Sequence, residues 1–265
     1  MASSKSAGEI LETVVEDGQQ ELERANVGLA FSGFVAGLNI SFSGIALVVV
    51  GALTGGIGFA AYAAYPIGFL IVILGRAQLF TENTVTPVVV VLSRPNRLLT
   101  MLRLWGVVLL FNILGAAIFA AAVVYGKVLE PAAFELLLEE VSKKMEYGFW
   151  ATTIKGVFGG WLVALVVWMV AASRDTISQA LIIYLLIMLI PATGLAHCVA
   201  GSSEILMSVF AGETAPLDYL GDFLVPATLG NGLGGFFLVT LLNYGQVIGS
   251  QSKPWLRRNR KDWET

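Results

Sequence analysis

Several apolar stretches of this chain approach the ~20 consecutive residues that cross the hydrocarbon core of a lipid bilayer. Inside hydrocarbon every backbone N–H and C=O group needs a partner within the protein, which restricts how such a segment can fold. The 265 residues are 56% hydrophobic and 13% charged, whereas a soluble domain carries roughly 25% charged residues. The sequence therefore predicts an all-α, polytopic membrane protein.

Hydropathy divides the chain into three parts. Residues 1–25 are predicted to form a cytoplasmic amphipathic helix, residues 26–250 the transmembrane domain, and residues 251–265 a basic cytoplasmic tail. The second and fifth of six expected spans are each too long and too interrupted to be one helix. The six spans lie at approximately 26–53, 58–92, 98–125, 147–172, 177–210 and 222–249.

Charged residues between the spans predict which side of the membrane each loop faces. Cytoplasmic loops carry the excess of Lys and Arg, so both termini are expected in the cytoplasm of a multi-pass inner-membrane protein. The charged residues in the connection before the sixth span are all acidic, namely Glu213, Asp218 and Asp222. The basic residues on the other side are Arg94, Arg97, Arg103, Lys253, Arg257, Arg258, Arg260 and Lys261.

The chain also repeats itself weakly. Spans three and six share an asparagine followed by a glycine, and spans one and four share a pair of glycines. Three plus three spans in opposite orientation form an inverted repeat, here about 26–125 and 147–249, with substrate expected at the broken helices. Chance similarity of glycine-rich apolar helices is the alternative. The matching residues are Asn112 and Asn231, Gly115 and Gly234, Gly33 and Gly156, and Gly37 and Gly160.

His197 is the only histidine of the chain, and Pro191, Gly194 and Gly201 interrupt the helix around it. A titratable side chain at bilayer depth is a candidate for a functional site. Broken backbone at that depth is tolerated only where it is buried in protein or lines a cavity. The alternative is a ring that only forms hydrogen bonds between two helices.

Thr81 lies in the corresponding break of the second span, so we expect it to approach His197. A threonine hydroxyl bonded to one ring nitrogen would fix the tautomer and leave the other nitrogen for a substrate. Half-helices that begin inside the membrane point free N–H groups at the site, which favours a small anion.

Apolar side chains near both breaks are expected to line the passage. An ion cannot cheaply lose its water between such side chains. Protonation of a weak-acid anion at His197 would remove the charge before the passage is crossed. The wall residues expected from the sequence are Tyr65, Phe69, Leu79, Phe80 and Ile190.

Four further ionisable residues lie near the breaks: Arg76, Glu82, Lys155 and Glu204. The two glutamates occupy comparable places in the two halves. Buried charges of opposite sign usually pair. Arg76 is therefore expected either to pair with one of the glutamates or to take part in substrate selection.

At these residues the chain strongly resembles the formate/nitrite transporter family, from the first span to the sixth. The segments that carry the resemblance are Leu79-Phe80-Thr81, His197, residues 225–231, Asn112 with Gly115-Ala116, and residues 161–169. The resemblance implies an aquaporin-like protomer with its own pore, assembled as a homopentamer. It also implies that Thr81 bonds His197, that the five apolar residues form slits, and that Lys144 is a vestibule lysine that attracts anions.

Three positions depart from the formate channel pattern. Ala196 and Gln78 replace acidic residues, and Gly201 replaces an asparagine. These changes, together with the LFTENT segment at 79–84, resemble a less characterised branch of the family.

The function expected is a proton-linked channel or transporter for formate-like or nitrite-like anions. A pore for a neutral or cationic solute that uses Glu82 and Glu204 is one alternative, and a non-transport membrane protein is another. An enzyme is not expected, although Cys198 adjoins His197. Neither a metal, a cofactor nor a nucleic acid partner is expected.

Overall fold

The computed structural model describes residues 4–250, and every regular element in that range is helical. The predicted basic tail, residues 251–265, lies outside the described residues. Four helical stretches are long and apolar enough to cross a membrane: Asn26–Thr54, Pro95–Tyr125, Gly148–Ala172 and Pro216–Gly249. Shorter apolar helices, Phe59–Leu74, Thr176–Ala192 and Cys198–Ala211, lie in the spans that the sequence predicts to be broken.

The first three spans form one half of the transmembrane domain. Their elements are α2 (Asn26–Ile40), α3 (Phe42–Thr54), α4 (Phe59–Ala64), α5 (Ile67–Leu74), η1 (Glu82–Thr84), α6 (Thr86–Ser93), η2 (Pro95–Arg97) and α7 (Leu98–Tyr125). The second half contains α9 (Gly148–Ala172), α10 (Thr176–Ile187), α11 (Leu189–Ala192), α12 (Cys198–Ala211), α13 (Pro216–Asp218), η3 (Tyr219–Leu224), α14 (Val225–Leu233), η4 (Gly234–Leu241) and α15 (Leu242–Ser250). The last span is continuous, with π-helical turns at η3 and η4.

The two halves pack in the same way, which supports the inverted repeat. α2 lies along α7 in the first half, and α9 lies along α14 in the second. A Cβ on Gly37 would overlap the carbonyl oxygen of Asn112, and a Cβ on Gly160 would overlap that of Asn231. Glycine at these positions is therefore required for the close approach of the two helices in each half. The fold is an all-α membrane protein with an aquaporin-like inverted repeat.

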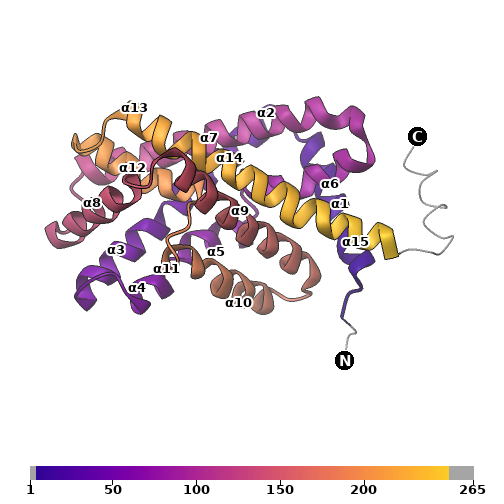
Figure 1. The fold of residues 1–265 in the computed structure, drawn as a ribbon, viewed down its shortest axis with the longest axis horizontal. Coiled ribbons are helices and arrows are strands. Elements are labelled where there is room, and N and C mark those ends of the chain that lie inside the picture. The colour runs from indigo at the N-terminus through magenta and orange to yellow at the C-terminus, as the bar shows by residue number, and fades with distance from the viewer. Residues whose placement is uncertain (1–3, 251–265) are drawn as a thin grey trace.

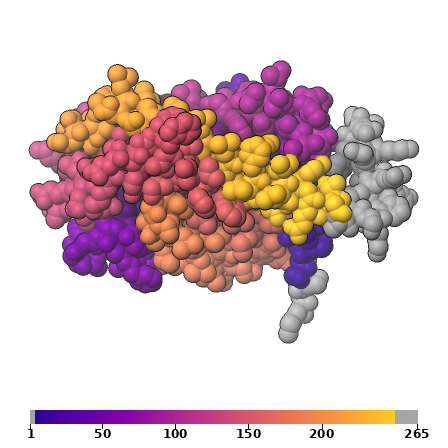
Figure 2. Space-filling view, in the orientation of Figure 1, coloured from indigo at the N-terminus to yellow at the C-terminus, as the bar shows by residue number. Residues whose placement is uncertain are grey.

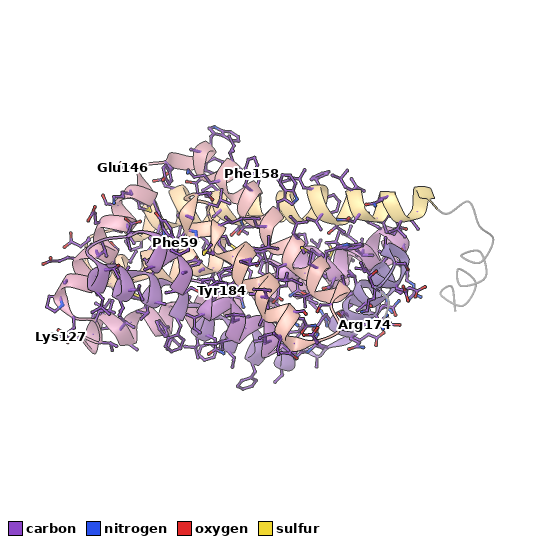
Figure 3. The ribbon with its side chains drawn as sticks, turned by 90° about the horizontal axis from the view of Figure 1, so that it is seen from below. Phe59, Lys127, Glu146, Phe158, Arg174 and Tyr184 are labelled. Carbon is purple, nitrogen blue, oxygen red and sulfur yellow. The ribbon has the colours of Figure 1, made fainter. Side chains whose placement is uncertain are left out.

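Two further helices lie outside the spans, at opposite ends of the elongated molecule (Figure 1). α1 (Ala7–Glu23) packs on α6, α9 and the end of α15, and α1 and α15 lie side by side in the space-filling view (Figure 2). α8 (Pro131–Met145) packs on α3 and α12 at the other end. Figure 3 labels Lys127 and Glu146 beside α8 and Arg174 toward the opposite end.

The sequence explains both of these helices. A capping box begins α1, because the Glu9 backbone N–H donates to Ser6 Oγ at 3.3 Å and the Ser6 N–H donates to Glu9 Oε2 at 2.6 Å. α1 buries an apolar stripe, and Gly18 lets its backbone reach the carbonyl group of Thr86 in α6. α8 begins at Pro131, which suits the first helical position.

Candidate functional site

The break of the second span, residues 75–85, is held open by a buried asparagine from α7. The Phe80 backbone N–H donates to Asn112 Oδ1 at 2.9 Å. Asn112 Nδ2 donates to the carbonyl oxygens of Gly33 and Gln78, at 2.8 and 2.9 Å. The Phe80 N–H and the Gln78 carbonyl oxygen belong to the interrupted segment, so this side chain binds two backbone groups that lack helical partners and ties them to α2 through Gly33.

The break of the fifth span, residues 193–197, is held by the equivalent asparagine. The Cys198 backbone N–H donates to Asn231 Oδ1 at 2.8 Å. Asn231 Nδ2 donates to the carbonyl oxygens of Gly156 and Ala196, at 2.7 and 2.9 Å. In the sequence both asparagines are recognisable as repeat markers, but their role as anchors of the breaks is not.

The helices that lead into the breaks also end alike. Arg76 follows α5 with φ of 57°, and Gly194 follows α11 with φ of 63°. The next N–H group then turns back to a helical carbonyl oxygen, from Ala77 to Val72 at 3.1 Å and from Leu195 to Ile190 at 2.9 Å. Arg76 therefore has the left-handed backbone conformation that glycine, the residue at the equivalent position 194, adopts most easily.

Thr81 and His197 meet between the two breaks, as the sequence predicts. Thr81 Oγ1 lies 2.9 Å from His197 Nε2, and the two residues are 0% and 2% exposed. The Ala200 backbone N–H donates to His197 Nδ1 at 3.1 Å, so the ring also caps the first turn of α12. The expectation that the second ring nitrogen is left for a substrate is therefore wrong for this structure.

This arrangement fixes the proton of the neutral ring. Nδ1 accepts a hydrogen bond from Ala200, so the neutral imidazole carries its proton on Nε2. Nε2–H then donates to Thr81 Oγ1. The Thr81 hydroxyl hydrogen is consequently free to donate elsewhere.

The five apolar residues expected along the passage are all buried. The ring of Phe69 packs edge-on against His197 with centroids 4.9 Å apart, and Tyr65 lies beside Phe69 at 5.9 Å. Phe80 contacts Trp105 with centroids 5.7 Å apart. Leu79 and Ile190 are 0% and 2% exposed.

A small cavity of about 20 Å³ reaches His197 from the α8 end of the molecule. Tyr65, Lys144 and Lys155 line this cavity, as does His197. Three further residues of the wall, Tyr147, Thr152 and Phe223, were not predicted from the sequence. A Cβ on Gly201 would overlap the ring of Phe223. Gly201, which departs from the formate channel pattern, therefore makes room for the Phe223 ring in the cavity wall. In the sequence, this departure at position 201 was the one signal that the wall differs here.

The two lysines of the cavity differ in their partners. Lys144 forms an ion pair with Glu204, whose side chain is 3% exposed. Lys155 Nζ donates to the carbonyl oxygen of Gly194 at 3.1 Å and lies 4.1 Å from the centre of the Tyr147 ring. Among the described residues no carboxylate lies within 4.0 Å of Lys155, so its charge is available to an anion.

The other two ionisable residues expected near the breaks, Arg76 and Glu82, lie toward α1. Glu82 is within electrostatic reach of Arg76 and of Glu21 in α1. Arg76 also acts on Asp17 of α1, where burial raises the pKa against this attraction. The expectation that Arg76 pairs with one of the two glutamates is not met for Glu204, which pairs with Lys144, and among the described residues no carboxylate lies within 4.0 Å of Arg76.

The fold, its paired breaks and the buried polar pair define a membrane protein whose two interrupted helices meet at a buried polar site. Residues 8–245 match the family model described as Formate/nitrite transporter. The chain belongs to this family.

Relatives and a solved structure agree with that assignment. The chain is 36% identical over 252 residues to "Inner membrane protein YfdC" of Escherichia coli (strain K12), covering 92% of this chain and 79% of the relative. It is 25% identical to "Formate channel BtFdhC" of Bacillus thuringiensis, covering 86% and 90%. The structure titled "Pentameric formate channel with formate bound" has a TM-score of 0.71 at 18% identity, covering 84% of this chain and 98% of that one. The named relatives are transport and membrane proteins, not enzymes.

Residues 4–250 contain no group of three His, Cys, Asp or Glu side chains that could hold a metal ion. Cys198, the first residue of α12, is a buried cysteine that forms no disulfide. The chemistry of the site is therefore that of hydrogen-bond donors, lysine charges and apolar walls.

Proposed function

We propose that this protein conducts small monovalent anions of weak acids, of the size of formate or nitrite. The observation that carries the proposal is the Thr81–His197 pair, which lies between apolar residues at the end of a lysine-lined cavity. Family membership and relatives named as formate channels support it.

The charges of the cavity favour an anion. Lys155 is the cation without a carboxylate within 4.0 Å among the residues described, so it can attract an anion toward His197. At the pair the Thr81 hydroxyl is free to donate to an oxygen of the anion. A charged species cannot cheaply cross the apolar residues that surround the pair.

Proton exchange at His197 removes that obstacle. To accept a proton at Nδ1 the ring must release the Ala200 N–H, so protonation is linked to the first turn of α12. The imidazolium can then pass its Nε2 proton to Thr81 Oγ1 as the Thr81 hydroxyl proton passes to the anion. This step leaves a neutral acid and a neutral ring, and the neutral acid crosses the apolar segment.

The assembly and orientation are part of the same proposal. A homopentamer in the inner membrane is supported by a structural neighbour titled as a pentameric formate channel. Both termini are proposed to be cytoplasmic, since Arg94 and Arg97 lie in the connection between α6 and α7, and Arg103, near the start of α7, bonds the backbone of α1. The cavity that contains Lys155 then opens to the opposite side.

Uptake of radiolabelled formate and nitrite into proteoliposomes tests this function. His197→Asn is the informative variant, because asparagine can still cap α12 but cannot exchange a proton near neutral pH. We expect uptake by this variant to lose its dependence on pH.

Two results would contradict the proposal. If the wild-type protein carries neither anion faster than empty liposomes, anion conduction is wrong. If His197→Asn changes neither the rate nor its pH dependence, proton exchange at His197 is wrong. Loss of cation uptake in Glu82→Gln, with no formate flux in the wild type, would favour a cation pore.

A further inference from the structure

The proposed function does not use the ion pair between Lys144 and Glu204 at the cavity. It joins α8 to α12, residues 60 positions apart in sequence. Lys144 lines the cavity and is 25% exposed at its side chain, whereas Glu204 lies behind it. Any anion that reaches Lys144 therefore competes with Glu204 for the same ammonium group.

Glu204 is incompletely satisfied in this pair. Its Oε2 bonds Lys144, and its Oε1 is buried without a hydrogen-bond partner among the described residues. The hydroxyl of Ser43, next to Gly44 that contacts the Glu204 side chain, is likewise buried and unpartnered. A buried carboxylate with one free oxygen gains less from its surroundings than one whose lone pairs are all bonded.

The geometry points to Glu204 as a specificity-determining residue that couples proton binding to anion binding at Lys144. We propose that protonation of Glu204 releases the Lys144 ammonium to bind a small monovalent anion in the cavity. Charge balances in this step: one proton neutralises the carboxylate, and one anion takes its place beside the ammonium. The inference rests on the proposed function for its physiological meaning, but not for its test.

This coupling provides a second place for a proton along the passage. His197 can accept one only by releasing Ala200, whereas Glu204 has an oxygen, Oε1, without a hydrogen-bond partner among the described residues. A weak acid could thus reach the cavity as an anion and a proton on separate groups. The departure of this chain from formate channels would then include how the permeant is admitted.

The other titratable groups that face Glu204 are few. Lys144 comes from α8, and Tyr65, at the end of α4, is within electrostatic reach. Tyr219 of η3 donates to Ser202 of α12 at 2.9 Å. Asp222 also lies in η3, and among the other elements that pack on α12, α2, α3 and α14 contain no charged residue.

Groups farther along the cavity and on neighbouring helices have other partners. Lys155 and Tyr147 contact each other, and His197 is bonded to Thr81. In α7, Arg103 bonds the backbone near α1, and Tyr125 packs on the ring of Phe210.

Nitrate is a suitable probe because its charge does not change over the working pH range. A bound ligand stabilises the folded protein, so the nitrate-dependent rise in melting temperature of the purified protein in detergent reports binding without transport. We expect the apparent nitrate affinity of the wild type to increase about tenfold or more between about pH 8 and pH 5.

Three variants test the assignment. Glu204→Gln should bind nitrate at pH 8 as tightly as the wild type does at pH 5, with little dependence on pH. Lys144→Gln should bind nitrate weakly at every pH. Lys143→Gln is the matched control, because Lys143 pairs with Glu139 and Glu140 on the exposed face of α8 and should behave as the wild type.

A double variant covers the case in which Glu204→Gln does not fold. Lys144→Gln with Glu204→Gln leaves no buried charge unpaired, and such replacements are often well tolerated. We expect it to bind nitrate weakly and independently of pH. The inference is overturned if the wild type shows no nitrate stabilisation, or if either Glu204 variant keeps the wild-type pH dependence.

These outcomes are separate from those of the proposed function. Formate uptake with unchanged pH dependence of nitrate binding in Glu204→Gln would leave the proposed function and remove the coupling. Coupled nitrate binding without any formate or nitrite flux would keep the coupling and remove the proposed function.

Discussion

The two breaks of this protein share a scaffold and differ in chemistry. Equivalent positions are 118 residues apart: 76 and 194, 78 and 196, 80 and 198. Positions 76 and 194 share a left-handed backbone conformation, and the other two pairs are bonded to the equivalent asparagines. By the same offset, however, Thr81 corresponds to Val199 and His197 corresponds to Leu79.

This difference shows which interactions belong to the fold and which belong to function. Interrupted backbone in a membrane must be bonded in both halves, so its anchors repeat. The polar pair is needed once, at the point where the two halves meet. Each repeat therefore supplies one member of the pair, and has an apolar residue at the position equivalent to the other member.

The anchors should show the largest effect. Asn231→Leu removes three buried hydrogen bonds, each worth about 0.6–2 kcal/mol between membrane helices, so we expect a loss of about 2–6 kcal/mol of stability. Asn112→Leu should cost a similar amount. Thermal unfolding in detergent compares the stability lost in the two variants. If neither can be recovered folded, both anchors are required for folding.

An aspartate substitution provides the matched control for each anchor. Asn231→Asp and Asn112→Asp keep the acceptor oxygen and lose the two bonds that the amide nitrogen donates. Both variants should be intermediate in stability between the wild type and the leucine variants. Wild-type stability in one leucine variant alone would show that the two breaks are not equivalent.

The sequence predicted the membrane fold because hydrocarbon leaves the backbone few alternatives. It also predicted the approach of Thr81 to His197, because the repeat brings the two breaks together. It did not predict the bond from Ala200 to His197, which depends on where α12 begins. The Lys144–Glu204 pair was also missed, since nothing in the sequence relates the register of α8 to that of α12.

Thr81→Val makes the first break resemble the second and should have the next largest effect. It leaves His197 Nε2–H without its acceptor, at a cost of about 1–3 kcal/mol, and removes the donor proposed for the anion. We expect formate uptake to fall by about tenfold to hundredfold. Thr81→Ser, which keeps the hydroxyl, should retain most of the flux, and equal rates in the two variants would contradict the role of the hydroxyl.

Gly194→Ala tests the shared turn at the end of the incoming helix. An added Cβ would meet Lys155 Nζ at 3.4 Å and Tyr147 Oη at 3.5 Å, which are ordinary contacts, so space is not limiting. The left-handed φ of 63° is the cost, about 1–2 kcal/mol for a residue with a Cβ. A melting temperature equal to that of the wild type would show that the turn can relax.

Arg76→Gly is the converse change and should have the smallest effect. The first break already contains a Cβ in the left-handed conformation, so glycine should relieve about 1–2 kcal/mol of strain and lose about 0.5–1 kcal/mol to the greater freedom of the unfolded chain. A small net gain in stability is therefore expected in thermal unfolding. Arg76→Ala separates strain from charge, because it keeps the Cβ and removes the guanidinium group that acts on Asp17 and Glu82. If alanine stabilises the protein as much as glycine does, the charge and not the turn distinguishes the first break from the second.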